Sequence, residues 1–91
     1  MNNKKITEEQ KKMMYNLFVS LKTIEDYEAL FEDLFTAKEL EQMVQRVSAA
    51  KMLMDGKTYN DVIEQTDISS ATLSRVSRCV QYGNGYSRFL K

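Results

Sequence analysis

The sequence predicts an all-α protein with a single domain over residues 1–91, and three observations support this. Apolar residues return every three or four positions along most of the chain, which is the period of one helix face. Threonine followed three positions later by Gln, Asp or Glu marks four helix starts. The sequence has no proline and only three glycines, so side-chain caps and glycines must separate the helices.

Two amphipathic helices are predicted in the first part of the chain, after a polar, lysine-rich segment over residues 1–6 that we expect to be frayed or arm-like. The first covers about 8–22 and is capped by Thr7 with Gln10, and the second runs from Thr23 to near Phe35. Their apolar stripes contain Met13, Met14, Leu17, Phe18, Leu21, Ile24, Tyr27, Leu30, Phe31 and Leu34. One further helix hardly covers so many large side chains. We therefore predict a homodimer, with an ordinary monomeric core as the alternative.

A longer helix follows over about 37–54, opened by the capping pair Thr36 and Glu39. Its predicted apolar stripe consists of Leu40, Met43, Val44, Val47 and Met54, with Ala50 at the edge. Gly56 follows Asp55 and is expected to end the helix, because glycine adopts left-handed backbone geometry without strain.

The segment of about 58–82 has the layout of a helix-turn-helix. Thr58 with Asp61 can cap a helix over about 59–66, and Ile68 is expected to anchor the following turn in the core. Ser69 or Ser70 then caps a second helix, whose first amides are left available for a phosphate. In DNA-binding proteins of this layout the second helix lies in the major groove.

The two faces of that second helix differ in chemistry. Leu73, Val76, Ser77 and Val80 are expected to pack inward, and the opposite face is small, hydroxylated and basic. Such side chains can approach base edges closely, and arginines can bind phosphates or guanine. The predicted DNA-binding residues are Thr58, Ser69, Ser70, Ala71, Thr72, Ser74, Arg75 and Arg78.

Charge is unevenly distributed, although thirteen basic and thirteen acidic residues balance. Residues 23–42 carry seven acids and one lysine, whereas residues 69–91 carry four basic residues and no acid. Affinity for phosphates depends on the local potential at the contact surface, so this pattern allows the last part of the chain to bind DNA. Solvated helix faces would give the same pattern without a partner.

Other classes of protein lack supporting residues. The sequence has no histidine, a single cysteine and no glycine-rich phosphate loop, so we expect neither an enzyme nor a metal site. No apolar run approaches the length of a membrane span, and no leader for export is visible. We expect a cytoplasmic protein.

Several strings resemble the tryptophan repressor family. They are Leu34-Phe35-Thr36-Ala37-Lys38-Glu39-Leu40, Gln45-Arg46-Val47, Gly56-Lys57-Thr58-Tyr59, Ala71-Thr72-Leu73-Ser74-Arg75 and Arg78-Cys79-Val80-Gln81-Tyr82-Gly83-Asn84-Gly85-Tyr86. Within that family the chain resembles more particularly the small YerC/YecD-type Trp-repressor-like proteins, and the resemblance covers roughly residues 13–90. It implies six helices, the last over about 86–90, in an intertwined homodimer with helix-turn-helix heads at both ends. It also implies that Ser70, Ala71 and Ser74 face the bases, with Thr72 and Arg75 near them.

The resemblance further implies an effector pocket formed by Arg46, Arg75 and a backbone group near Thr36, because the tryptophan repressor holds an indole between two arginines. Val76 stands where the repressor has glycine, and its side chain would intrude on an indole-sized slot. We therefore expect no cofactor and no tryptophan co-repressor, and the sequence identifies no other small-molecule effector. Asp67 likewise replaces a family glycine in the turn, at a modest cost in left-handed geometry.

The sequence thus predicts a homodimeric, sequence-specific DNA-binding transcriptional regulator, and among regulators a repressor. Two reading helices about one DNA turn apart, ~34 Å, would bind a palindromic operator. The alternative is a helical protein-interaction module that acts on the transcription machinery. Its working face would be the acidic surface of residues 23–42.

Overall fold

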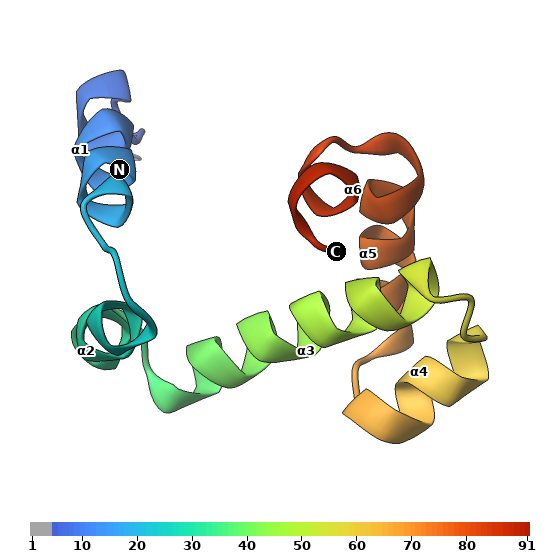
Figure 1. Cartoon of the computed structure of the whole chain (residues 1–91). Helices are drawn as coiled ribbons and strands as arrows, with labels where there is room; N and C mark the ends of the chain where they lie inside the picture. The colour runs from blue at the N-terminus through green and yellow to red at the C-terminus, as the bar shows by residue number, and fades with distance from the viewer. Residues whose placement is uncertain (1–4) are drawn as a thin grey trace. The chain divides into compact units, whose positions relative to one another are not determined.

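The computed structural model describes residues 5–91, which form six helices without a strand (Figure 1). The predicted all-α class is confirmed. The chain divides into two compact units, Met1–Phe35 and Thr36–Lys91. The single domain over residues 1–91 stays a prediction. The first four residues of the expected N-terminal arm lie outside the described part.

The first unit contains helices α1 (Glu8–Val19) and α2 (Ile24–Leu34). Thr7 and Thr23 cap them through reciprocal bonds with Gln10 and Asp26, as predicted. α1 ends three residues before the predicted 22, and the Ser20 hydroxyl at its C-cap donates to the carbonyl of Leu17 at 2.6 Å. Local sequence signals therefore set the starts of both helices.

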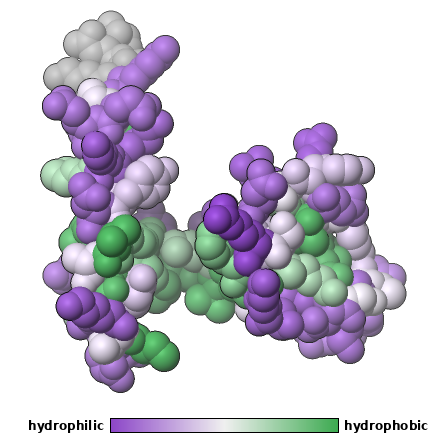
Figure 2. Space-filling view, turned by 45° about the horizontal axis from the view of Figure 1, so that its top comes forward, coloured by the Kyte–Doolittle hydropathy of each residue, from purple (hydrophilic) through white to green (hydrophobic). Residues whose placement is uncertain are grey.

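Aromatic contacts join the two helices of this unit. The Phe31 ring lies 5.7 Å from that of Phe18, 5.8 Å from that of Tyr27 and 5.0 Å from that of Phe35. Edge-on and tilted pairs at such distances are favourable. No residue of α1 or α2 is buried, however, and hydrophobic residues remain on the surface of the molecule (Figure 2).

The second unit contains α3 (Ala37–Met54), α4 (Tyr59–Thr66), α5 (Ser70–Tyr82) and the short α6 (Gly85–Phe89). The bounds of α3 and α4 agree with the prediction, and α6 starts one residue before the predicted 86. Gly56 ends α3 with a φ of 88°, in the left-handed region that glycine tolerates best.

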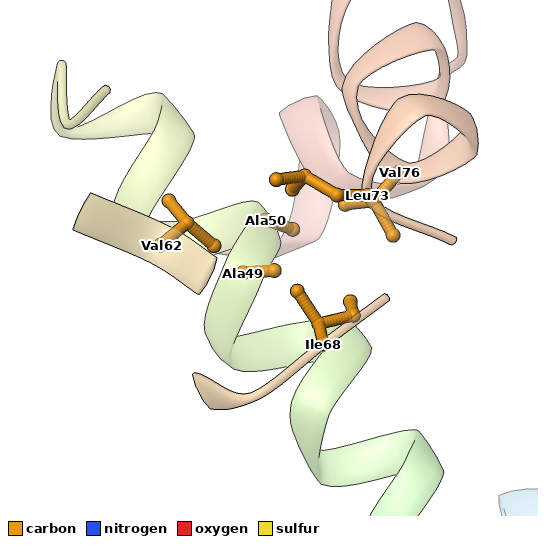
Figure 3. Close-up of a cluster of buried hydrophobic side chains, with 6 residues drawn as sticks. All are labelled: Ala49, Ala50, Val62, Ile68, Leu73 and Val76. Carbon is orange, nitrogen blue, oxygen red and sulfur yellow. The ribbon is translucent and has the colours of Figure 1, made fainter. Parts of the chain in front are cut away.

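The core of this unit lies where α3, α4, α5 and the α4–α5 turn meet (Figure 3). Its buried hydrophobic residues are Ala49, Ala50, Val62, Ile68, Leu73 and Val76. The predicted inward residues of α5 are buried or, for Val80, half-buried, and Ile68 anchors the turn as expected.

The side of α3 that faces the core differs from the predicted apolar stripe. Ala50, placed at the edge of the stripe, is fully buried beside Ala49, whereas Val44 and Val47 remain 56% and 46% exposed. Small alanines pack here because they let α5 approach the α3 backbone closely.

Among residues 5–91 no helix is long and apolar enough to cross a membrane.

Candidate nucleic-acid interface

The α4–α5 turn is fixed by hydrogen bonds at the end of α4. The hydroxyl of Thr66 donates to the carbonyl of Val62 at 2.7 Å and accepts from the amide of Ile68 at 3.3 Å. The side-chain amide of Gln45 in α3 donates to the backbone carbonyl of Thr66 at 3.2 Å. Asp67 adopts a φ of 62°, so the aspartate takes the left-handed geometry that the sequence led us to expect. The turn therefore holds α5 at a defined angle to α3.

Ser69 rather than Ser70 caps α5. Its hydroxyl accepts from the amide of Thr72 at 3.2 Å and donates to the Thr72 hydroxyl at 2.9 Å. The first amides of a helix have no partner within the helix. The cap satisfies the amide of Thr72 and leaves those of Ser70 and Ala71 at the open end of α5. Thr58 performs the same capping role for α4, with its hydroxyl accepting from the amide of Asp61 at 3.2 Å.

The outward face of α5 is formed by the residues predicted for it. Ser70, Ala71, Ser74, Arg75 and Arg78 are all exposed, and Thr72 is half-buried at the edge. On the opposite side Leu73, Val76 and Ser77 are buried. The face is thus presented by a helix that is itself anchored in the core.

Electrostatically, the outward face carries only positive charge. α5 contains two arginines and no acidic residue. Within residues 5–91, ion pairs form only between Lys11 and Glu8 and between Lys51 and Asp55. Arg75 and Arg78 are therefore not neutralised by a carboxylate in the described chain.

The outward face of α5, formed by Ser70, Ala71, Ser74, Arg75 and Arg78, is named the reading face. A pocket of about 410 Å³ lies beside it. It is lined by Arg46, Ala71, Thr72, Arg75, Val76, Cys79 and Tyr86. Arg46 of α3 and Arg75 of α5 are thus brought to one pocket, whereas Thr36 caps the start of α3 and does not line it. Val76 is 3% exposed and belongs to the core cluster, so its side chain occupies part of the space between the helices.

Comparisons with known proteins agree with this geometry. The family described as Trp repressor protein matches residues 9–91. The chain belongs to the Trp repressor family. It is 42% identical over 71 residues to the uncharacterized protein YerC of Bacillus subtilis (strain 168), a match that covers 78% of this chain and 68% of YerC.

Two solved structures of the family have the same fold. One is a crystal structure from Staphylococcus aureus assigned as a Trp repressor, with a TM-score of 0.84 at 30% identity, covering 89% of this chain and 82% of that one. The other is a TrpR-like protein from Eubacterium eligens ATCC 27750, with a TM-score of 0.82 at 38% identity, covering 90% and 84%. The Trp repressor-like fold is thereby confirmed. Proteins of this family are regulators and not enzymes, which confirms that prediction also.

Two parts of the site were missed by sequence reasoning. Tyr86 and Cys79 line the pocket beside Arg75. Cys79 follows Arg75 by four residues on α5, a spacing visible in the sequence, whereas Tyr86 reaches the pocket only because the α5–α6 corner folds back, which has no local sequence signal. Lys38 and Gln42 line a second depression next to the start of α5. Their spacing of four residues places them on one side of α3, and this signal was available in the sequence.

Proposed function

We propose that the protein is a sequence-specific DNA-binding transcriptional regulator, a repressor that binds a palindromic operator in the cytoplasm as a homodimer. The observation that carries this proposal is the outward face of α5. That face is exposed, free of acids and rigidly supported, and it belongs to a helix-turn-helix of a family of DNA-binding regulators. Its small hydroxylated residues suit base edges, and its arginines suit phosphates or guanine.

Homodimerisation is part of this proposal. In the single chain, large apolar side chains of α1, α2 and α3 remain strongly exposed, among them Met13, Met14, Leu17, Leu34, Val44 and Val47. Exposed apolar surface on this scale marks an interaction site. A second copy would cover such surface and would provide the second reading helix that a palindromic site requires.

We also propose that tryptophan is not the co-repressor. The pocket between Arg46 and Arg75 is flanked by the buried side chain of Val76, which narrows the space available for an indole ring. Added tryptophan should therefore leave the affinity for the operator unchanged. A tenfold or larger gain in affinity on adding it would contradict this part of the proposal.

The decisive experiment is selection of bound fragments from sheared genomic DNA at ~0.15 M salt, where non-specific contacts are already weak. Recovery of a short palindromic sequence supports the proposal and identifies the target genes. Recovery of no sequence by the folded dimer would contradict it. The acidic surface of residues 23–42 would then be the leading candidate for a working face.

Arg75→Ala tests the placement of the reading face on that recovered site. We expect a loss of ~1–3 kcal/mol in binding free energy, because the exposed guanidinium is removed from the face that meets DNA. Arg88→Ala is the matched control, since Arg88 lies on α6 over the ring of Phe89, at 5.0 Å. Fluorescence anisotropy with a labelled duplex gives both affinities. Equal affinities for the two variants would place the reading face elsewhere.

A further inference from the structure

A polar groove lies between the N-terminal half of α3 and the start of α5, with a volume of about 320 Å³. It is lined by Lys38, Glu41, Gln42, Gln45, Arg46, Asp67, Ile68, Ser69 and Thr72. Of its lining residues, Ser69 and Thr72 are among the predicted DNA-binding residues, whereas Lys38 and Gln42 of α3 are not.

The two edges of the groove carry opposite charge. Lys38, Gln42 and Arg46 follow one another at intervals of four, which places them along one side of α3. Arg46 also lines the pocket that contains Arg75, so this basic edge continues into the reading face. Glu41 and Asp67 border instead a shallow depression at the α4–α5 turn. The acids therefore lie on the edge away from Arg75.

The donors on the basic edge are available. Lys38, Gln42 and Arg46 are exposed, and within residues 5–91 neither Lys38 nor Arg46 forms an ion pair. The hydroxyl of Ser69, a lining residue, satisfies the amide of Thr72 and leaves the amides of Ser70 and Ala71 open at the same end of α5. Cationic side chains next to open helix amides match the charge and hydrogen-bonding needs of a phosphate.

We propose that backbone phosphates of DNA bind along this basic edge, so that the DNA-binding surface extends from α5 over two turns of α3 to Lys38. This inference rests on the proposed function. The distance from Arg46 to Lys38 along α3 is ~12 Å, because a helix rises ~1.5 Å per residue. That length spans about three phosphates of one strand, at ~3.4 Å of axial rise each.

The test compares Lys38→Gln with Lys51→Gln in the full-length protein. Lys51 lies on the same helix but pairs with Asp55 at 3.1 Å and does not line the groove. Affinity for an operator duplex and for an unrelated duplex is measured at salt concentrations from 50 to 200 mM. Thermal unfolding checks that both variants fold like the parent protein.

For Lys38→Gln we expect the negative slope of log affinity against log salt to become less steep by ~0.9 for each subunit. The loss of affinity between 50 and 200 mM salt then becomes roughly threefold smaller per removed contact. The affinities for the operator duplex and for the unrelated duplex should decrease by the same factor, because phosphates carry no sequence information. Lys51→Gln should keep the parental slope.

Three outcomes would overturn the inference. An unchanged slope for Lys38→Gln, with binding still sensitive to Arg75→Ala, would confine DNA contacts to α5 and leave the proposed function intact. Loss of affinity for the operator duplex alone would mean that Lys38 reads a base. Failure of the parent protein to bind either duplex at any of these salt concentrations would overturn both the inference and the proposed function.

Discussion

The two units of the chain use the same local signals but differ in what they bury. Each of α1, α2, α3 and α4 is preceded by a capping threonine. Its hydroxyl accepts from the backbone amide three residues later, and the side chain of that later residue accepts from the amide of the threonine. Residues 36–91 then enclose six buried hydrophobic residues, whereas no residue of α1 or α2 is buried. Capping therefore specifies where a helix starts and says little about whether it is stable.

This difference indicates a division of labour. The second unit positions α5 through its own core, so the reading face can be ordered within one chain. Burial of apolar area is the main stabilising contribution in folding, and α1 and α2 obtain little of it from the described chain. Under the proposed function a second copy supplies that burial. The helices of the first unit would then be stabilised by dimerisation.

The largest effect should come from truncating the centre of the second unit. Leu73 is fully buried, and Leu73→Ala is expected to cost ~2–5 kcal/mol in the free energy of unfolding. Leu30→Ala in α2 is the matched truncation at a half-buried position, and we expect less than half that loss. Urea unfolding followed by circular dichroism measures both. Equal losses at a protein concentration where the chain is a monomer would contradict the contrast between the units, because no second copy can then bury Leu30.

A second prediction concerns the surface of α1. Leu17 is 43% exposed in the single chain, and Leu17→Asp should raise the dimer dissociation constant about tenfold to a hundredfold for each of the two substituted copies, because burying a leucine contributes ~1.5–3 kcal/mol. Val19→Asp makes the same change at a position that is 80% exposed, on the other side of α1. Analytical ultracentrifugation should detect dissociation in the first variant only. Equal weakening of the dimer by both substitutions would show that Leu17 does not lie in the dimer interface.

Sequence patterns determine the local features of these helices better than the packing between them. Reciprocal pairs such as Thr58 with Asp61 predicted helix starts correctly because a cap depends on residues only three positions apart. The inward and outward sides of α5 were predicted correctly because they differ sharply in chemistry.

The side of α3 that faces the core could not be read in the same way. α3 has apolar residues on more than one side, and their periodicity does not tell which side packs within the chain. The size of the side chains determines which side packs within the chain. Ala49 and Ala50 are small enough for another helix to pack closely against them, whereas Val44 or Val47 would hold that helix further away. The pocket residue Tyr86 depends on the α5–α6 corner, and no local pattern encodes that fold. The roles of the DNA-binding residues stay predictions.

The smallest predicted effect is the pH dependence of the α2 cap. The Asp26 carboxylate accepts hydrogen bonds from the backbone amides of Lys22, at 3.0 Å, and Thr23, at 3.2 Å. These bonds lower the pKa of Asp26 below its ordinary value of 3.8. A lowered folded-state pKa means that the carboxylate stabilises the folded protein above pH 3.8. This contribution is lost as the pH falls through the lowered pKa.

Asp26→Asn keeps the shape of the side chain and removes its charge at every pH. We expect the parent protein to melt at a slightly higher temperature than the variant at neutral pH. The difference should shrink below pH 3.8 and vanish once the carboxyl is protonated in the folded state. Thermal unfolding followed by far-ultraviolet circular dichroism between about pH 7 and pH 2 measures it. A difference that stays constant over this range would show that Asp26 acts on α2 through its hydrogen-bonding geometry and not through its charge.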